Sequence, residues 1–133
     1  MKFFRRKPAF VDARGAITDI LDGVPLNAVT IITNKKGAVR ANHFHKKTIQ
    51  YTYVLTGRVK YVSRGRKGGT TTVIMKPGDL AVSPPHEAHA TEALTDATFL
   101  ALAHGLRHGR DYEKDTFRLA EPLIAPKKKA SRK

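Results

Sequence analysis

The stretch RANHFHKKTIQYTYVLTG, residues 40–57, decides the fold of this chain. His43 and His45 are separated by one residue, and side chains alternate along a strand, so both imidazoles are expected on one face. Gln50 opens the next strand-like run, and a tight hairpin between the two strands would bring its amide to the same volume. Half-buried histidines also occur in ordinary strands, where they only satisfy hydrogen bonds. The pair therefore indicates a site without defining one.

The rest of the chain also has the sequence pattern of short β-strands. Short runs rich in β-branched and aromatic residues recur, separated by glycine, proline and lysine turns, as is typical of antiparallel barrels and sandwiches. The expected strands are 10–20, 27–34, 37–45, 49–55, 57–64, 70–76, 80–83, 89–91 and 98–104. Thr56-Gly57 predicts a hairpin that pairs 49–55 with 57–64. A two-sheet, all-β jelly roll would protect the strand edges of such a chain.

The composition of the chain limits the number of domains, the kinds of metal site and the kinds of partner. A length of 133 residues favours a single domain, and the absence of cysteine excludes disulfides and thiolate metal sites. The formal net charge is +14, but nine basic residues lie in the first seven and last seven positions, which leaves about +5 between them. Such tails attract polyanions non-specifically, so no specific nucleic-acid partner is expected.

These patterns predict three segments: a basic N-terminal arm (1–9), a barrel (10–125) and a disordered basic tail (126–133). No run approaches the roughly 20 apolar residues of a membrane span. The N-terminus lacks the apolar region of a signal peptide. We therefore expect a cytoplasmic protein with no membrane partner.

A third histidine extends the pair. His89 lies on a later strand, after the Pro77-Gly78-Asp79 turn. Three imidazoles and the Gln50 amide oxygen, converging inside a barrel, would suit one divalent ion such as Zn, Ni, Fe or Mn. A neutral glutamine adds no charge, so the site would be weaker than one with a carboxylate.

The spacing of these residues resembles the two signature motifs of the cupin superfamily. The first motif is matched by Gly37, His43, His45, Gln50 and Gly57, with Gln50 in place of glutamate. The second is matched by Gly78, Pro84 and His89, with His86 in place of glycine and Ala93 in place of asparagine. The resemblance implies a double-stranded β-helix, commonly dimeric, with metal ligands at His43, His45, Gln50 and His89.

A narrower resemblance points to sugar chemistry. RANHFHKKTIQ (40–50) is similar to a stretch of nucleotide-sugar 3,4-ketoisomerases, apart from Ala41, where that group has glycine. DARG (12–15) resembles the opening of those enzymes and of keto-sugar 3,5-epimerases, and DYEKDTFRL (111–119) resembles an acidic segment near their end. The resemblance implies a nucleotide-linked sugar as substrate, in deoxysugar or polysaccharide biosynthesis.

Three functions are compatible with these observations. In the first, an isomerase or epimerase uses His43 and His45 as acid and base, since imidazole titrates near neutral pH. In the second, a metal-dependent dioxygenase, lyase or other isomerase uses the His/His/Gln/His site. In the third, the pocket binds a sugar without catalysis.

Three further residues are expected to bind substrate: Arg40, His86 and Tyr112. Arg40 and His43 face opposite ways on a regular strand, so Arg40 requires a bulge or a place at the rim. His86 is expected at the pocket mouth. Tyr112 and Asp115 would help to close the site if the C-terminal segment folds over the mouth.

Overall fold

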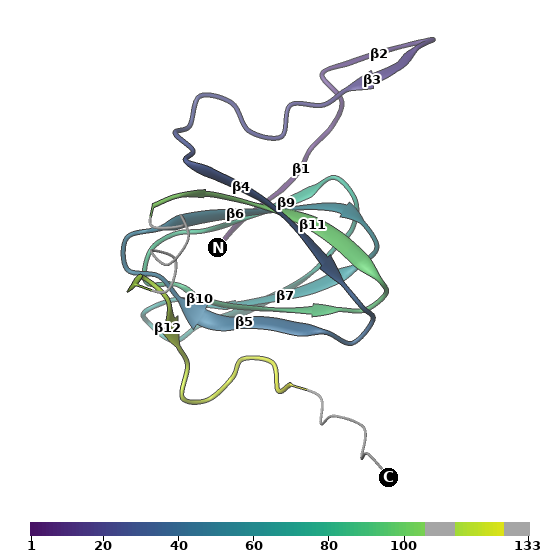
Figure 1. Cartoon of the computed structure of the whole chain (residues 1–133). Helices are drawn as coiled ribbons and strands as arrows, with labels where there is room; N and C mark the ends of the chain where they lie inside the picture. The colour runs from purple at the N-terminus through teal and green to yellow at the C-terminus, as the bar shows by residue number, and fades with distance from the viewer. Residues whose placement is uncertain (106–113, 127–133) are drawn as a thin grey trace.

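The computed structural model describes residues 1–105 and 114–126. Two five-stranded antiparallel sheets face each other, and a separate two-stranded hairpin projects from them (Figure 1). This confirms the predicted fold, an all-β, single-domain double-stranded β-helix. Among the described residues, no helix is long and apolar enough to cross a membrane.

The chain crosses repeatedly between the two sheets, as a jelly roll requires. The first sheet contains, in spatial order, β1 (Lys2–Arg5), β9 (Asp79–Ser83), β6 (Ile49–Thr56), β11 (Ala97–His104) and β4 (Ala28–Asn34). The second sheet contains β12 (Phe117–Arg118), β5 (Val39–Phe44), β10 (Ala88–Ala93), β7 (Val59–Arg64) and β8 (Thr70–Met75). The projecting hairpin consists of β2 (Phe10–Asp12) and β3 (Gly15–Ile17).

The two predicted hairpins around β6 are wrong. β5 and β7 belong to the second sheet, whereas β6 lies between β9 and β11 in the first. Gly57 does make a turn, with a φ of 79°, and a Cβ there would lie 2.3 Å from the main-chain oxygen of Asp96. The turn carries the chain across the barrel instead of back along the same sheet. Turn chemistry marks where a strand ends, but it does not choose the partner strand.

One half of the barrel interior is filled by apolar side chains. This apolar half comprises Val54, Val59, Tyr61, Met75, Ala81, Ala93, Ala97 and Phe99, and each is at most 4% exposed. Tyr51 and Tyr53 point to the outer face of the first sheet, where Ile20, Leu21 and Leu26 pack over them. Both tyrosines belong to a buried cluster with Leu80 and Leu102.

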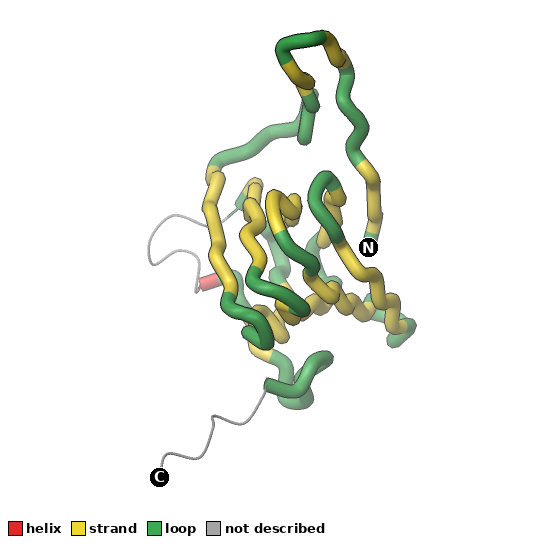
Figure 2. The backbone as a smooth tube through the Cα atoms, turned by 90° about the vertical axis from the view of Figure 1, so that its right-hand side faces the viewer, coloured by secondary structure: helices red, strands yellow, loops and turns green. Residues whose placement is uncertain are grey.

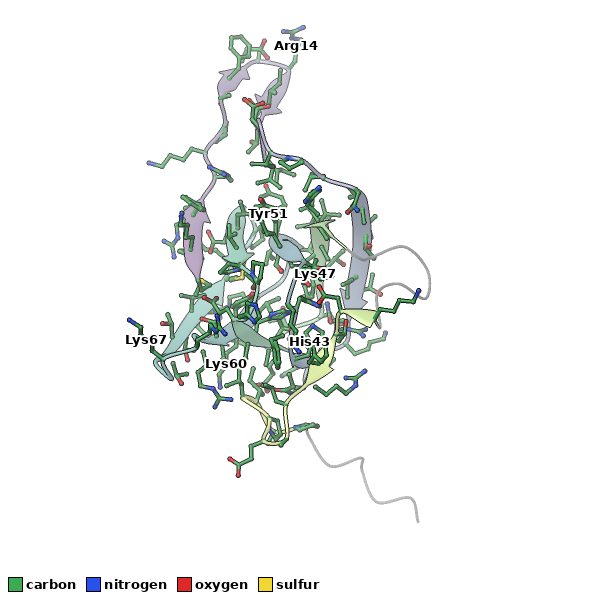
Figure 3. All side chains as sticks on the ribbon, turned by 90° about the vertical axis from the view of Figure 1, so that its left-hand side faces the viewer. Arg14, His43, Lys47, Tyr51, Lys60 and Lys67 are labelled. Atoms are coloured by element: carbon green, nitrogen blue, oxygen red, sulfur yellow. The ribbon has the colours of Figure 1, made fainter. Side chains whose placement is uncertain are left out.

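The N-terminal part of the chain differs from its predicted segments. Residues 1–9, expected to form a basic arm, contain β1, which pairs with β9 at the edge of the first sheet. The β2–β3 hairpin, which the sequence assigns to the barrel, lies well away from it (Figure 2). Arg14 marks its tip, where the guanidinium pairs with Asp12 at 2.7 Å in solvent (Figure 3). The predicted basic tail, apart from its first residue, lies outside the described residues.

Candidate functional site

Three buried imidazoles, called here the imidazole floor, cluster between the sheets, and two of them, His43 and His89, line a pocket there. His43 and His45 come from the end of β5, and His89 lies opposite His43 in the β10–β5 pairing. The ring centroid of His43 lies 4.8 Å from that of His45 and 4.7 Å from that of His89. All three side chains are at most 5% exposed. The predicted convergence of the three histidines is therefore present in the structure.

A β-bulge just before His43 sets the direction of the neighbouring side chains. Ala41 and Asn42 have φ angles of 70° and 57°, and the pairing with β10 shifts register at this point. The left-handed region strongly favours glycine, so alanine at position 41 adopts it at a cost in energy. The extra residue changes the strand parity and turns Arg40 toward the pocket that His43 faces. The bulge that Arg40 requires is thus observed.

Arg40 is held at the rim of the pocket. Its Nε donates to the Asn34 side-chain oxygen at 2.7 Å, and Nη2 donates to the Thr33 main-chain oxygen at 3.0 Å. Asn34 is buried, and its side-chain nitrogen donates in turn to the Ala97 carbonyl. These contacts restrict the rotamers of Arg40, so the guanidinium is oriented before any ligand arrives.

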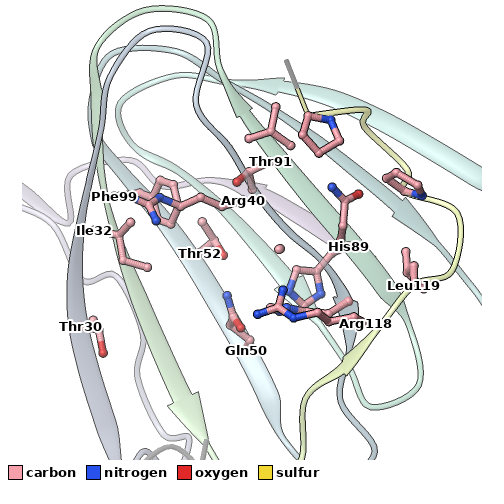
Figure 4. Close-up of a pocket in the computed structure, with 16 residues that line it drawn as sticks. Thr30, Ile32, Arg40, Gln50, Thr52, His89, Thr91, Phe99, Arg118 and Leu119 are labelled. Atoms are coloured by element: carbon pink, nitrogen blue, oxygen red, sulfur yellow. The ribbon is translucent and has the colours of Figure 1, made fainter. Parts of the chain in front are cut away.

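The first sheet supplies the opposite wall. Gln50 and Thr52 project inward from β6, and Phe99 projects from β11 (Figure 4). The Gln50 side-chain oxygen lies 3.3 Å from Nε2 of His45, so the two sheets meet across the pocket at this pair. The cavity has a volume of about 830 Å³. This is within the range of small-molecule sites and large enough for a nucleotide-linked sugar.

The C-terminal strap, defined here as residues 115–126, forms the remaining wall. It pairs with β5 through β12 and carries Arg118, Leu119, Pro122 and Pro126 to the pocket. The Asn42 side chain anchors it by accepting from the main-chain nitrogen of Ile124 and donating to its oxygen, at 3.1 and 2.9 Å. Arg118 was not predicted as a site residue. It lies in the 111–119 segment that resembles the sugar ketoisomerases, but the alternation in TFRL is too short to indicate a strand.

One of the predicted substrate-binding residues, His86, lies outside the main pocket. His86 faces a separate shallow depression with Phe44, Lys46 and Arg66, and it does not line the main pocket. Its backbone is also in the left-handed region, with a φ of 69°. The main-chain nitrogen of His86 donates to the His45 carbonyl at 2.6 Å, which turns the loop away from the mouth. Tyr112 lies outside the described residues.

Burial keeps His89 neutral. Desolvation lowers the pKa of His89 well below its ordinary value, and the neighbouring His43 and His45 lower it further. Neither ring nitrogen of His89 makes a well-formed hydrogen bond to a described residue. Tyr61 stacks on the His89 ring with centroids 6.1 Å apart and shares a short hydrogen bond with Ser83. A neutral imidazole with an available lone pair is the form that binds metal ions or accepts a proton.

The same three histidines fit the geometry of a metal site. Ligand nitrogens of His43, His45 and His89 lie within 4.8 Å of one another. Three imidazoles suit Zn, Ni or Fe, and such catalytic sites keep an open position for water or substrate. The predicted fourth ligand, Gln50, faces this group, with its side-chain oxygen 3.3 Å from Nε2 of His45. The donor set is therefore compatible with a divalent ion.

Solved structures share this architecture. The 3,4-ketoisomerase QdtA from Thermoanaerobacterium thermosaccharolyticum, in complex with TDP, is 22% identical, with a TM-score of 0.74 over 90% of this chain and 88% of that one. The RmlC epimerase of Mycobacterium tuberculosis is 18% identical, with a TM-score of 0.73 over 86% and 66%. A single-residue variant of oxalate decarboxylase from B. subtilis is 27% identical, with a TM-score of 0.60 over 68% and 23%.

These likenesses confirm the predicted resemblance to sugar ketoisomerases and epimerases at the level of the fold. The oxalate decarboxylase carries different chemistry on a similar barrel, so the fold alone does not assign a reaction. No curated protein matches the chain. The family model described as "Cupin domain" matches residues 30–104, which include both histidine strands. With its jelly-roll sheets and imidazole floor, this chain belongs to the cupin family.

Proposed function

We propose that this cupin isomerises or epimerises a nucleotide-linked keto-sugar in deoxysugar or polysaccharide biosynthesis. The observation that carries the proposal is the pairing of two kinds of group in one cavity. Buried imidazoles form the floor, and Arg40 and Arg118 lie on the walls. A sugar diphosphate needs both, because guanidinium groups bind phosphate oxygens and imidazoles exchange protons with carbon acids. The structural neighbours include a dTDP-4-dehydrorhamnose 3,5-epimerase and a 3,4-ketoisomerase in complex with TDP, which supports the same substrate class.

The reaction requires few groups. A base removes the proton from the carbon beside the ketone, and the C–H electron pair forms a C=C bond as the carbonyl becomes an enolate. The proton then returns to carbon, either on the opposite face or at the neighbouring position after proton transfer between oxygens. His43 and His45 face one volume and serve as base and acid. Arg40 or Arg118 stabilises the enolate oxygen or holds the diphosphate.

Deuterium exchange tests the proposal whichever product is formed, because every variant of the reaction begins with loss of the same kind of proton. The protein is incubated in D₂O with TDP-4-keto-6-deoxyglucose, the ligand of one neighbouring ketoisomerase structure, and incorporation beside the ketone is followed by NMR. We expect His43→Gln and His45→Gln each to slow exchange by about 100-fold or more. His104→Ala, an exposed histidine at the end of β11, is the matched control. Equal exchange in all variants would exclude the acid–base role, and binding without exchange would indicate a sugar-binding module.

A metal-dependent reaction is the second candidate, and the three converging ligand nitrogens favour it. His43, His45 and His89 would hold the ion, which would polarise a substrate carbonyl as a Lewis acid. A metal-bound imidazole cannot also act as a free base, so the two candidates exclude each other for His43 and His45. Elemental analysis after dialysis distinguishes them. Stoichiometric metal that is lost in His89→Ala supports the metal site, whereas exchange by metal-free protein supports the free base.

We also propose that the protein is a homodimer. Phe10, Val11 and Ile17 on the projecting hairpin are 54–66% exposed, and an isolated two-stranded hairpin is only marginally stable in water. Val29 and Ile31 are exposed to a similar extent on the outer face of β4, at the edge of the first sheet. A second copy would cover both surfaces.

Light scattering coupled to gel filtration tests this arrangement. The wild-type chain should elute with the mass of a dimer, and Val11→Ser combined with Ile17→Ser should shift it toward the monomer. Lys67→Ser, in an exposed turn of the barrel, is the control. A wild-type mass equal to one chain at all concentrations would contradict the proposal.

A further inference from the structure

Asp115 makes an unusually complete set of contacts at the base of the strap. Its carboxylate accepts from the main-chain nitrogens of Lys46, Lys47 and Thr48 at 2.9, 3.0 and 2.9 Å, and from Oγ1 of Thr48 at 2.8 Å. The side chain is buried, with 3% exposure. Burial raises the pKa of Asp115, but these hydrogen bonds outweigh it and hold the pKa below its ordinary value. The carboxylate thus ties the strap to the turn between β5 and β6.

The main chain of the same residue contacts the imidazole floor. Nδ1 of His45 lies 2.7 Å from the Asp115 carbonyl oxygen, across 70 residues of sequence. A carbonyl oxygen can only accept, so Nδ1 of His45 must carry the hydrogen. The lone pair of the neutral ring is therefore on Nε2, the nitrogen that faces the side chain of Gln50, which itself lines the pocket. The Gln50 amide can turn to donate to that lone pair or rotate away from it.

We propose that Asp115 is a positioning residue that fixes the tautomer and the ring orientation of His45. Its carboxylate locks the strap onto residues 46–48, and the lock places its carbonyl where only the Nδ1–H tautomer fits. The consequence is that Nε2 of His45 is presented as an acceptor toward Gln50, at the wall of the cavity. The strap thus acts on the chemistry of the floor as well as closing the wall of the pocket.

This inference rests on the proposed function only in treating His45 as a group that reacts with the substrate. The tautomer itself is a property of the protein without ligand, so it can be measured whether or not any sugar is turned over. Failure of the sugar chemistry and failure of the positioning role would therefore appear in different experiments.

The tautomer is read directly by ¹⁵N NMR of the histidine rings. The full chain is labelled and treated with chelator, because a bound ion could impose a tautomer by itself. In the wild type, Nδ1 of His45 should show the shift of a protonated ring nitrogen and Nε2 that of an unprotonated one. Asp115→Asn turns an amide NH₂ toward main-chain N–H groups and should relax the lock. We expect its His45 signals to move toward the average of the two tautomers.

A matched variant separates positioning from general loss of stability. Asp79 is also a buried aspartate that accepts a main-chain hydrogen bond, from Lys76 at 3.0 Å, but at the start of β9. Asp79→Asn should lower the melting temperature and leave the His45 signals unchanged. An unchanged His45 tautomer in a folded Asp115→Asn variant would overturn the proposal.

A milder change covers the case in which Asp115→Asn does not fold. Thr48→Val removes one donor to the carboxylate and leaves the three main-chain donors in place. We expect a smaller shift of the His45 signals in the same direction, and the absence of any shift would overturn the proposal. If the deuterium exchange is observed, Asp115→Asn should slow it by about 10–100-fold, in line with other residues that orient a reactive histidine.

Discussion

The two halves of the barrel interior are built from the same strands but filled in opposite ways. On β6, Thr52 lines the pocket and Val54, two residues later on the same face, belongs to the apolar half. On β10, Thr91 lines the pocket, and Ala93, two residues later, belongs to the apolar half. One half buries apolar side chains completely, while the other buries three imidazoles beside a cavity. Stability and chemistry therefore occupy mainly separate lengths of these strands, and the two regions meet where Phe99 lines the pocket and Tyr61 stacks on His89.

Met75→Ala should give the largest effect, and only on stability. Met75 is fully buried in the apolar half. Its truncation should lower the free energy of unfolding by about 2–5 kcal/mol, since a cavity is left behind. Urea denaturation measures the change, and deuterium exchange in the folded variant should remain near the wild-type rate. Ile74→Ala, next in sequence but 45% exposed on the outer face, is the control and should cost much less. Equal losses would show that the apolar half is not the stabilising region.

Arg118→Ala should affect binding and leave stability nearly unchanged. An arginine that bonds phosphate contributes about 1.5–3 kcal/mol, so the Kd for TDP should rise about 10–100-fold. Titration calorimetry measures the Kd. Arg66→Ala, beside the separate depression lined by His86, is the control. An unchanged Kd would place the nucleotide away from the strap.

Gln50→Glu should strengthen metal binding by about tenfold, or about 1.4 kcal/mol. The carboxylate adds a charge opposite the three imidazoles, and oxygen ligands of this kind hold divalent ions more tightly than an amide. Competition with a chromogenic chelator measures the affinity for Zn²⁺. Glu92→Gln, on β10 but paired with Lys60 away from the cavity, is the control. No gain in affinity would show that position 50 is not a ligand.

His89→Leu should give the smallest effect on stability, and with the opposite sign to Met75→Ala. His89 is buried without a well-formed hydrogen bond, and an apolar side chain of similar size avoids its desolvation. We expect the free energy of unfolding to rise by about 1 kcal/mol while metal binding is lost. A loss of several kcal/mol would mean that the imidazole stabilises the fold.

The parts of the site that could be predicted from the sequence are those whose geometry depends on residues close together in the chain. His43 and His45 share a face because strands alternate, and the motif spacing added His89. Arg118 and the contact from Asp115 to His45 could not be predicted, because they depend on a strap that returns to β5 from about 70 residues away in sequence. The place of His86 also escaped prediction, since a left-handed backbone angle and one hydrogen bond to the His45 carbonyl turn it from the mouth.

Side-chain alternation and turn residues were enough to predict the all-β jelly roll and the shared face of His43 and His45, and the resemblance to the cupin motifs added His89, because these signals act over a few positions of the chain. Three other features emerge only in the folded molecule: which strands pair, that β6 faces β5 across the barrel, and that the bulge at Ala41 and Asn42 turns Arg40 inward. A fourth is the nitrogen of His45 that faces Gln50. The reason is physical, since strand pairing and the tautomer depend on groups that meet only when the two sheets close on each other.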